Sequence, residues 1–271
     1  MPMRTLLYIY VLLGSTFTLG CQKKDTYAAR SASPSPIQAE KLADLNPPPF
    51  ICAEGTSCPE AIGQLVTLSG QGPEGCTATL VKPDLVLTAS HCVPWETLED
   101  KKTFDNNCWI RWPQLTGKAH EIIACGSIVQ ASTIDFDRQE QVQLDYAFIR
   151  LSRPSQRNAI GLDQERAAAS PRVRLFGIAM DATDENGILR HELRELHCDR
   201  NDNFDLDTIE TLPGETIVLP TCPIQSGYSG GPIFNEASKV ITGVLSFMRF
   251  HLETEAAGPA VGTRVPHSLS L

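Results

Sequence analysis

The sequence has little positive charge, no apolar run long enough to cross a membrane, and few aromatic residues. Its 271 residues include 23 Lys and Arg against 32 Asp and Glu, which gives a formal net charge of −9. Binding to phosphate backbones needs clustered Lys and Arg, so a chain with this deficit is a poor nucleic-acid ligand. We therefore expect no nucleic-acid partner.

The apolar run near the N-terminus is too short for a membrane span, which needs about 20 apolar residues. It extends from Leu6 to Leu13, follows a single basic residue, Arg4, and ends in small residues near Gly20. This layout is typical of a signal peptide. The sequence thus predicts a signal peptide over residues 1–20 and an exported protein.

The residues around Cys21 resemble the processing site of a bacterial lipoprotein precursor. That resemblance implies that Cys21 is lipidated and becomes the new N-terminus, which would anchor the protein to a membrane. The chain has Thr18 and Leu19 where that family prefers Leu and a small residue. The alternative is ordinary signal cleavage, with Cys21 lost or unpaired and the protein secreted or periplasmic.

Residues 21–49 contain the proposed anchor and a polar, proline-bearing segment without apolar periodicity. The segment includes Ser33-Pro34-Ser35-Pro36 and Pro47-Pro48-Pro49. Such composition favours a flexible chain with stiff polyproline pieces. We interpret it as a tether between the anchor and a folded domain over residues 50–271.

Nine cysteines are too many for an ordinary cytosolic protein and indicate an oxidising compartment. Without Cys21 the number is even, as a disulfide framework requires. The remaining eight are Cys52, Cys58, Cys76, Cys92, Cys108, Cys125, Cys198 and Cys222. A metal cluster built from His191, His197 and Cys198 lacks the paired short spacings of a zinc site, so no metal is expected.

The folded domain consists of short apolar runs separated by turn residues. Aromatics at 7%, with 19 Gly and 19 Pro, favour a turn-rich β protein over a helical bundle. Examples of the runs are Gln64–Leu68, Leu85–Thr88, Ala147–Leu151 and Val240–Leu245. Many runs of this length over about 200 residues predict an all-β sandwich or pair of barrels.

Three segments carry side chains that suggest nucleophilic catalysis: 87–92 with His91, 144–151 with Asp145, and 226–234 with Ser229. Each has a structural explanation by itself, since a His beside a Cys, an Asp before a strand and a Gly-rich turn are common. Glycines around Ser229, however, let backbone N–H groups approach a ligand. With Ser229 as nucleophile, the Gly227 and Ser229 N–H groups would face the oxyanion. His91 would take the hydroxyl proton and Asp145 would orient the imidazole.

Together the three segments resemble the trypsin-like (chymotrypsin-fold) serine peptidases. Thr88–Cys92 is similar to the histidine motif of that family, Asp145 with the strand after it to the aspartate motif, and Gly227–Pro232 to the serine motif. The order His, Asp, Ser is also that of the family, unlike the order in α/β-hydrolases. The resemblance covers residues 61–265. It implies two antiparallel six-stranded Greek-key β-barrels with the active site in the cleft between them, and a monomeric endopeptidase without cofactor that acts on proteins or peptides.

The resemblance and the even cysteine count lead us to expect four disulfides. They are Cys76–Cys92, Cys198–Cys222, Cys108–Cys125 and Cys52–Cys58. The first follows from the resemblance, and its loop of about 15 residues corresponds to about 3 kcal/mol of stability. The second would tie the second barrel beneath the serine loop, and the last two rest on elimination and proximity.

The resemblance also assigns substrate-binding residues. Ser246 would lie next to the catalytic Asp, and the backbone of Ser246, Phe247 and Met248 would pair with the substrate chain as an added strand. At Tyr228, trypsin-type members carry an Asp that captures a newly cut N-terminus. Activation of that kind is therefore not expected here.

The matched specificity pocket has no carboxylate. Pro223 falls at its base, and Met248 and Ala260 fall where open-pocket members have Gly. A substrate Lys or Arg would lack a partner there, which is costly, so we expect a small or medium apolar residue before the scissile bond. Arg249 and Arg264 lie nearby in the sequence and could attract an acidic residue at the same substrate position, which is the alternative.

A calcium-binding loop and a non-catalytic binding protein are the two remaining interpretations of the sequence. Residues 199–210 have oxygen side chains at the spacing of an EF-hand calcium loop. Phe204 occupies the position that needs Gly, so we expect an acidic solvated loop instead. The alternative to an enzyme is a non-catalytic cell-surface binding lipoprotein on the protease fold.

Overall fold

The computed structural model describes residues 48–69, 72–94, 97–98, 104, 107–132, 141–142, 144–162, 170–203, 210–211, 215–235, 240–250 and 257–266. The predicted signal peptide, Cys21 and most of the predicted tether lie outside these ranges. Within them, no helix is both long and apolar enough to cross a membrane.

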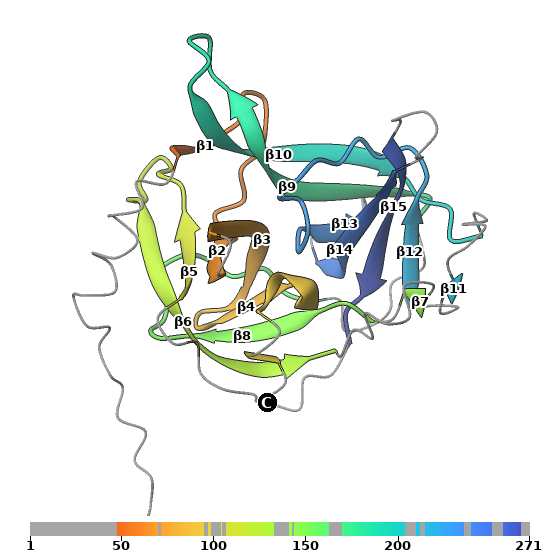
Figure 1. The fold of residues 1–271 in the computed structure, drawn as a ribbon, viewed down its shortest axis with the longest axis horizontal. Helices are drawn as coiled ribbons and strands as arrows, with labels where there is room; N and C mark the ends of the chain where they lie inside the picture. The colour runs from red at the N-terminus through yellow and green to blue at the C-terminus, as the bar shows by residue number, and fades with distance from the viewer. Residues whose placement is uncertain are drawn as a thin grey trace, which may run out of the picture. The chain divides into compact units, whose positions relative to one another are not determined.

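The regular secondary structure of the described chain is almost entirely β-strand, as the short apolar runs predict (Figure 1). A single 3₁₀ turn, η1 (Ser90–Cys92), follows the fourth strand. The strands are β1 (Phe50–Cys52), β2 (Ile62–Ser69), β3 (Gly72–Lys82), β4 (Leu85–Thr88), β5 (Cys108–Trp112), β6 (Glu121–Ala131), β7 (Gln141–Val142), β8 (Ala147–Leu151), β9 (Arg172–Thr183), β10 (Leu189–Asp199), β11 (Glu210–Thr211), β12 (Thr216–Leu219), β13 (Pro232–Asn235), β14 (Ile241–Phe250) and β15 (Ala257–Arg264).

The first half of the domain is a closed barrel with strand order β2-β3-β4-β8-β6-β5. All of its strand pairs are antiparallel. Leu65, Leu80, Val86, Ile110 and Ile149 are among the apolar side chains that fill its interior. This half confirms the predicted six-stranded antiparallel barrel.

The second half differs from the predicted closed barrel, because its sheet is open and has seven strands. Its order is β1-β10-β9-β13-β14-β15-β12, and β1 is added parallel to β10. The other six strands form the antiparallel set that the resemblance implied. No ladder joins β10 to β12 among the described residues. The Cys198–Cys222 disulfide joins the end of β10 to the segment after β12, and just after β10 Asn201 N donates to Val218 O of β12 at 3.0 Å.

A separate apolar cluster connects the barrel to the open sheet. It combines Leu87 and Phe148 of the barrel with Phe176, Phe234 and Val244 of the open sheet. The rings of Phe176 and Phe234 meet edge to face, with centroids 5.6 Å apart. Because interiors of this kind are close-packed, the cluster fixes the barrel and the sheet against each other, next to the segments that contain the three motifs.

The eight cysteines of the domain form the four expected disulfides. The bridges are Cys52–Cys58, Cys76–Cys92, Cys108–Cys125 and Cys198–Cys222. The pairing predicted from the resemblance and from elimination is therefore confirmed.

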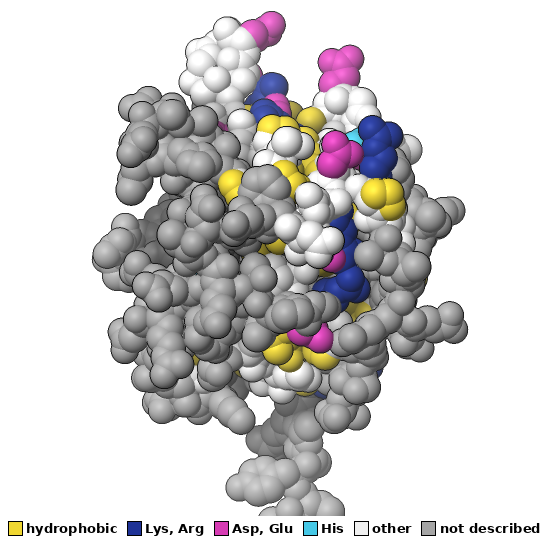
Figure 2. Space-filling view, turned by 90° about the vertical axis from the view of Figure 1, so that its right-hand side faces the viewer, with side chains coloured by type: hydrophobic (Ala, Val, Ile, Leu, Met, Phe, Trp, Pro, Cys, Tyr) yellow, Lys and Arg dark blue, Asp and Glu magenta, His cyan; other side chains and the backbone are white. Residues whose placement is uncertain are grey.

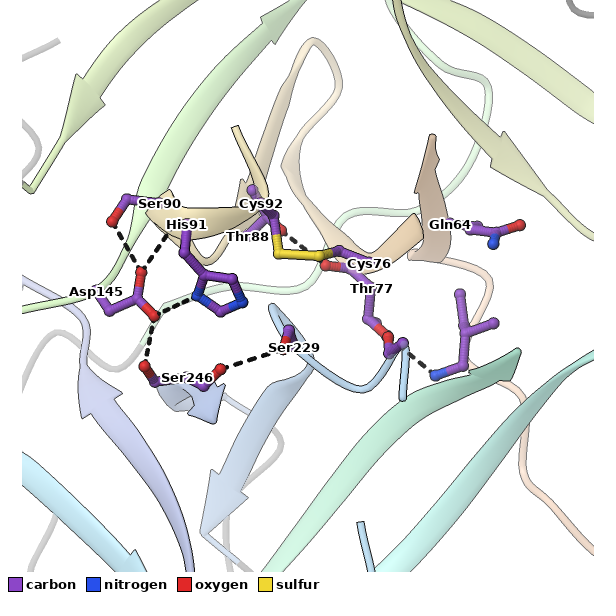
Figure 3. Close-up of a disulfide and its surroundings, with 12 residues drawn as sticks. Gln64, Cys76, Thr77, Thr88, Ser90, His91, Cys92, Asp145, Ser229 and Ser246 are labelled. Carbon is purple, nitrogen blue, oxygen red and sulfur yellow. Dashed lines mark hydrogen bonds and ion pairs between the residues drawn. A yellow bond between two sulfur atoms is a disulfide. The ribbon is translucent and has the colours of Figure 1, made fainter. Parts of the chain in front are cut away.

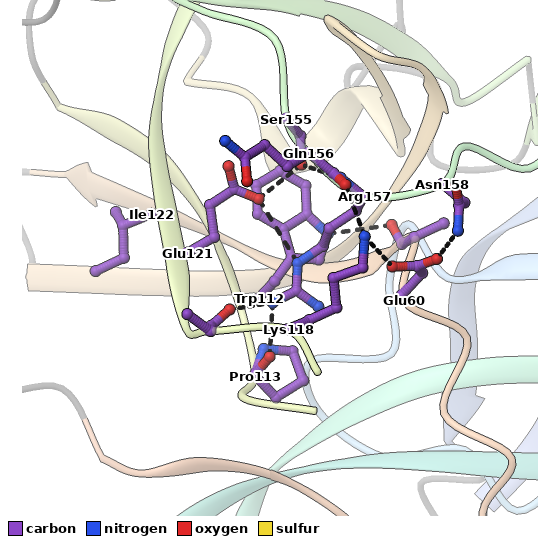
Figure 4. Close-up of polar contacts among 12 residues, drawn as sticks. Glu60, Trp112, Pro113, Lys118, Glu121, Ile122, Ser155, Gln156, Arg157 and Asn158 are labelled. Carbon is purple, nitrogen blue, oxygen red and sulfur yellow. Dashed lines mark hydrogen bonds and ion pairs between the residues drawn. The ribbon is translucent and has the colours of Figure 1, made fainter. Parts of the chain in front are cut away.

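A buried polar network around Arg157 supports the barrel (Figure 4). The Arg157 guanidinium donates to the carbonyls of Pro113, 2.7 Å, and Ala119, 2.8 Å, and pairs with Glu121 at 3.6 Å. The Ser155 hydroxyl donates to the same carboxylate at 2.7 Å. A buried cation needs an ion pair and hydrogen bonds, and this network supplies both to Arg157 through Nε and Nη2, while Nη1 has no described partner.

The charged residues of the described surface are interspersed. Acidic and basic side chains lie beside one another on the face in Figure 2. Arg172 pairs with Asp199 at 3.5 Å, and Arg264 lies 3.9 Å from Asp202. The described residues of this face thus form no broad basic patch of the kind that binds nucleic acid.

Candidate active site

His91 lies in the 3₁₀ turn η1, directly after the buried strand β4 (Figure 3). The next residue, Cys92, is bound to Cys76 on β3. The disulfide attaches the turn to the barrel wall and so limits the movement of the imidazole. Sequence motif, turn and disulfide together place His91 at the edge of the barrel.

Asp145 lies just before β8 and is only 3% exposed. Its Oδ2 accepts hydrogen bonds from His91 Nδ1, 2.7 Å, and from the Ser246 hydroxyl. Its Oδ1 accepts from the Ser90 hydroxyl, 2.8 Å, and from the His91 backbone N–H, 3.1 Å. An ionised carboxylate can only accept, so Nδ1 of His91 carries a proton and the neutral ring leaves Nε2 free to act as a base.

The two groups shift each other's pKa values. Burial disfavours the charged form of both residues. For His91 the hydrogen bond and negative charge of Asp145 outweigh burial and hold its pKa above the ordinary value. For Asp145 the hydrogen bond and charge of His91, with the hydroxyls of Ser246 and Ser90, outweigh burial and hold its pKa below the ordinary value. The pair therefore favours an ionised carboxylate beside an imidazole that readily accepts a second proton.

Ser229 lies in the loop before β13, and its hydroxyl donates to the Ser246 carbonyl at 3.1 Å. The described contacts include no hydrogen bond between Ser229 and His91. A rotation about the side-chain torsion of Ser229 is needed to direct its proton to Nε2. Such bonds are often loose in an unliganded site and tighten when substrate binds.

The carbonyl hydrogen bonds of the serine loop set the direction of two backbone N–H groups. The Ser226 carbonyl accepts from Met180 N at 3.4 Å, and the Tyr228 carbonyl accepts from Gly231 N at 2.9 Å. In a trans peptide the N–H points opposite to the C=O, so the Gly227 and Ser229 N–H groups point away from those donors. The geometry suits an oxyanion site formed by these two amides.

Glycine is required at position 227. Its φ is +92°, in the left-handed region, and a Cβ there would overlap the Ile178 carbonyl and the Met180 side chain. Only glycine tolerates both conditions without strain. The Gly in the motif is therefore a condition of the loop's conformation.

Thr77 holds the serine loop to the barrel, and the sequence reasoning did not single it out. Its hydroxyl donates to the Gly227 carbonyl, 2.8 Å, and accepts from Ile178 N, 3.0 Å. Its backbone N–H donates to the Ser229 carbonyl at 2.8 Å. The only signal in the sequence was its place next to Cys76, which says nothing about a loop 150 residues later.

Comparison with known proteins agrees with this geometry. The model of the family described as "Trypsin-like peptidase domain" matches residues 76–243. The chain belongs to the trypsin-like peptidase domain family. No curated protein sequence matches it.

Solved structures of serine proteases are similar to this trypsin-like peptidase domain in fold. The thermostable serine protease AL20 from an extremophilic microorganism has a TM-score of 0.53 at 20% identity, over 76% of this chain and 91% of its own. The protease Anisep from Arthrobacter nicotinovorans has a TM-score of 0.53 at 21% identity, over 76% and 90%. The scabies mite inactivated protease paralogue S-I1 has a TM-score of 0.56 at 20% identity, over 76% and 90%. Because one of these is an inactivated protease, the fold by itself does not decide catalysis.

In this trypsin-like peptidase domain, Tyr228 is packed into the interior and is 1% exposed. Its ring lies so close to Gly177 on β9 that a Cβ there would overlap it. Burial raises the pKa of Tyr228, and the neighbouring Arg194 guanidinium partly counteracts that rise. Arg194 also donates to Gln225 Oε1 at 2.8 Å. The serine loop is thus held by a buried aromatic ring and by a half-buried cation on β10.

The residues matched to the specificity pocket differ in burial. Ala260 on β15 is buried and belongs to one apolar cluster with Leu219 and Ile224, whereas Pro223 is exposed. The assignment of these residues to the pocket stays a prediction. The backbone of Phe247 and Met248 lies on β14, opposite Val261 and Ala260. The side chains of these two residues lie outside the described part.

The EF-hand-like segment is described only in part, since residues 204–209 lie outside the described ranges. In the described part, Arg200 donates to the Asp202 carboxylate, with Nε to Oδ1 at 2.7 Å. Asp202 Oδ1 also accepts from Val218 N at 3.4 Å. These oxygens are engaged with the protein's own donors.

Proposed function

We propose that this domain is a serine endopeptidase that hydrolyses peptide bonds through an acyl-enzyme on Ser229. The observation that carries the proposal is the Asp145–His91 pair, 2.7 Å apart, facing a serine whose loop also sets the direction of two backbone N–H groups. His91, Asp145 and Ser229 would form the catalytic triad, and Gly227 and Ser229 the oxyanion site. The reaction needs no cofactor.

The reaction would follow from the positions of these groups. The Ser229 hydroxyl turns from the Ser246 carbonyl to His91 Nε2 and loses its proton as its oxygen attacks the substrate carbonyl carbon. The N–H groups of Gly227 and Ser229 stabilise the negative oxygen of the tetrahedral intermediate. His91, charged and held by Asp145, gives the proton to the leaving amine. Water, deprotonated by His91, then releases the acyl group and restores Ser229.

Labelling with a fluorophosphonate probe tests this proposal, because the probe reacts only with an activated serine. We expect stoichiometric labelling of folded, disulfide-intact protein, and none after Ser229→Ala substitution. A folded protein that takes up no label would favour a non-catalytic binding protein on the same fold. The inactivated paralogue from the scabies mite is a precedent for that outcome.

The substrate chain would lie along β14. Up to Leu245 both edges of this strand are paired. One edge pairs with β15, and the other pairs with β13 and, at Leu245, with Gly230 and Gly231 of the serine loop. From Ser246 to Met248 only the pairing with β15 continues among the described residues. The other edge is suited to strand addition by a substrate backbone, which recognises main chain rather than sequence.

We predict cleavage after small or medium apolar residues, such as Ala, Val or Leu. Ala260 belongs to a buried apolar cluster, and the matched pocket positions include no carboxylate, so a substrate Lys or Arg would lose its hydration without gaining an anionic partner. A mixed peptide library analysed by mass spectrometry would measure the preference. Strong cleavage after Lys or Arg would refute our placement of the pocket, and cleavage after Asp or Glu would point to Arg249 or Arg264.

We also predict activity without a newly cut N-terminus. Tyr228 cannot bind an ammonium group as an Asp does, and its burial together with Arg194 already holds the serine loop. Protein that begins within residues 22–49 and carries an N-terminal tag should have the same kcat as protein from which the tag has been removed. Activity that rises only after proteolytic trimming would contradict this expectation.

We further propose that the protein is exported and anchored by a lipid on Cys21, with residues 22–49 as tether. Cys21→Ser should move the protein from the detergent phase to the aqueous phase in a phase-partition experiment, with unchanged fluorophosphonate labelling. If the variant stays in the detergent phase, the apolar segment anchors the protein instead of a lipid.

A further inference from the structure

Ser90 donates a hydrogen bond to the carboxylate that orients His91, from within the histidine motif itself. Its side chain is fully buried, at 0% exposure, and its Oγ lies 2.8 Å from Asp145 Oδ1. Oδ1 is the oxygen turned away from the imidazole, and its other described partner is the His91 backbone N–H. Ser90 is therefore bound to the triad while its hydroxyl contacts neither His91 Nδ1 nor Ser229.

The carboxylate of Asp145 fixes the direction of the Ser90 proton, and a second serine, Ser132, lies behind the Ser90 hydroxyl. Ser132 Oγ lies 3.3 Å from Ser90 Oγ and accepts from the Tyr146 N–H at 2.9 Å. The ionised carboxylate can only accept, so the one proton of Ser90 points to Asp145. The Ser132 proton is then directed to Ser90 Oγ or to the Tyr146 carbonyl, 3.2 Å away. Hydrogen bonds in such a chain polarise one another.

We propose that Ser90 is a positioning residue of the triad, whose hydroxyl, supported by Ser132, withdraws negative charge from Asp145 and so limits how strongly His91 holds a proton. The inference deepens the proposed function, on whose triad it rests. Ser90 acts through Asp145 and touches neither substrate nor the reacting oxygen.

The surroundings of the pair make this hydroxyl effective. The described groups that act on Asp145 are His91, the hydroxyls of Ser90 and Ser246, and the Thr263 hydroxyl, which accepts from the Asp145 N–H at 3.2 Å. Among the described residues, Asp145 is the charged group that shifts the pKa of His91. In a buried site, a hydroxyl whose proton points at the carboxylate reduces the negative potential that the carboxylate produces at the imidazole.

The sign of the effect follows directly. Without the Ser90 hydroxyl, Asp145 presents more negative charge to His91 and stabilises the imidazolium further. The pKa of His91 should then rise, and the base form needed for catalysis should be lost at a higher pH. In the native protein the hydroxyl keeps His91 neutral, and hence active, to lower pH.

The experiment measures the pKa of His91 in Ser90→Ala by NMR titration of its ring, and the pH dependence of kcat/KM. Both should shift upward by about half a pH unit, because one hydrogen bond to a buried carboxylate has an effect of that order on its partner. Ser132→Ala should shift them in the same direction by less. Ser155→Ala is the matched control, since it removes a buried hydroxyl that donates to Glu121 at 2.7 Å, remote from the triad, and it should shift neither.

The NMR titration separates this inference from the proposed function. An upward shift in protein without peptidase activity would uphold the role of Ser90 and refute the proposed function. An unchanged His91 pKa in Ser90→Ala, with the Asp145–His91 bond still seen as a low-field proton resonance, would overturn the inference. If Ser90→Ala does not fold, Ser90→Cys tests the same point with a weak donor of similar size, and the same two outcomes apply.

Discussion

Replacing Ser229 by alanine is expected to lower kcat about 10⁶-fold, because the members of a nucleophile–base unit fail together when one is removed. The substitution removes one described hydrogen bond, which the Ser229 hydroxyl donates to the Ser246 carbonyl at 3.1 Å. The loop keeps its bonds to Thr77 and Leu245 through the backbone of Ser229 and Gly230. Thermal stability and disulfide content should therefore remain those of the native protein.

Steady-state kinetics on a cleaved peptide, with active-site titration, would measure the loss. Ser226→Ala is a suitable control, because Ser226 is an exposed residue of the same loop and its described bond is made by its backbone carbonyl. That control should keep kcat within about twofold, as surface substitutions away from special contacts usually do. A Ser229→Ala protein that retains one tenth of the activity would show that another residue is the nucleophile.

Replacing Asp145 by asparagine should lower kcat about 10⁴-fold, because an amide favours the wrong imidazole tautomer. The substitution also removes the charge that holds the His91 pKa above its ordinary value. The acid limb of the residual kcat/KM profile should therefore move to lower pH. A lower rate with an unmoved acid limb would contradict the role of Asp145 as the charged partner of His91.

The same substitution should destabilise the fold in a pH-dependent way. The pKa of Asp145 is held below its ordinary value, so its stabilising contribution is present above the pKa of an unfolded Asp. That contribution is lost as pH falls through the folded pKa. The difference in unfolding free energy between the native protein and the variant should thus shrink in acid.

Asp84→Asn provides the control for charge removal. Asp84 pairs with Arg150 at 2.6 Å on the exposed side of the barrel, where such pairs contribute little. Both kcat and its pH profile should be unchanged. A neutral result for Asp145→Asn itself would direct attention to Asp135 and Asp137, which lie outside the described residues.

The sequence by itself determined the features that depend on local pattern. Runs such as Leu85–Thr88 and Ala147–Leu151 are strands because they are short, apolar and bounded by turn residues. The motifs around His91, Asp145 and Ser229 could be found because each is contiguous, with a cysteine beside His91, an apolar strand after Asp145 and glycines around Ser229. The family could be recognised for the same reason, and the even cysteine count made the disulfides accessible.

The tertiary structure alone decided which distant residues support those motifs. Thr77 binds the Gly227 carbonyl across 150 positions, and Arg194 reaches Gln225 from a neighbouring strand. Ile224 is buried in the apolar cluster that contains Ala260 whereas Pro223 is exposed, and the second sheet remains open with β1 added to it. Strand register and packing set these contacts, and a change of one residue in register would turn every side chain of a strand to its other face. The residues next to a position in the sequence therefore do not show which distant residue it will contact in the fold.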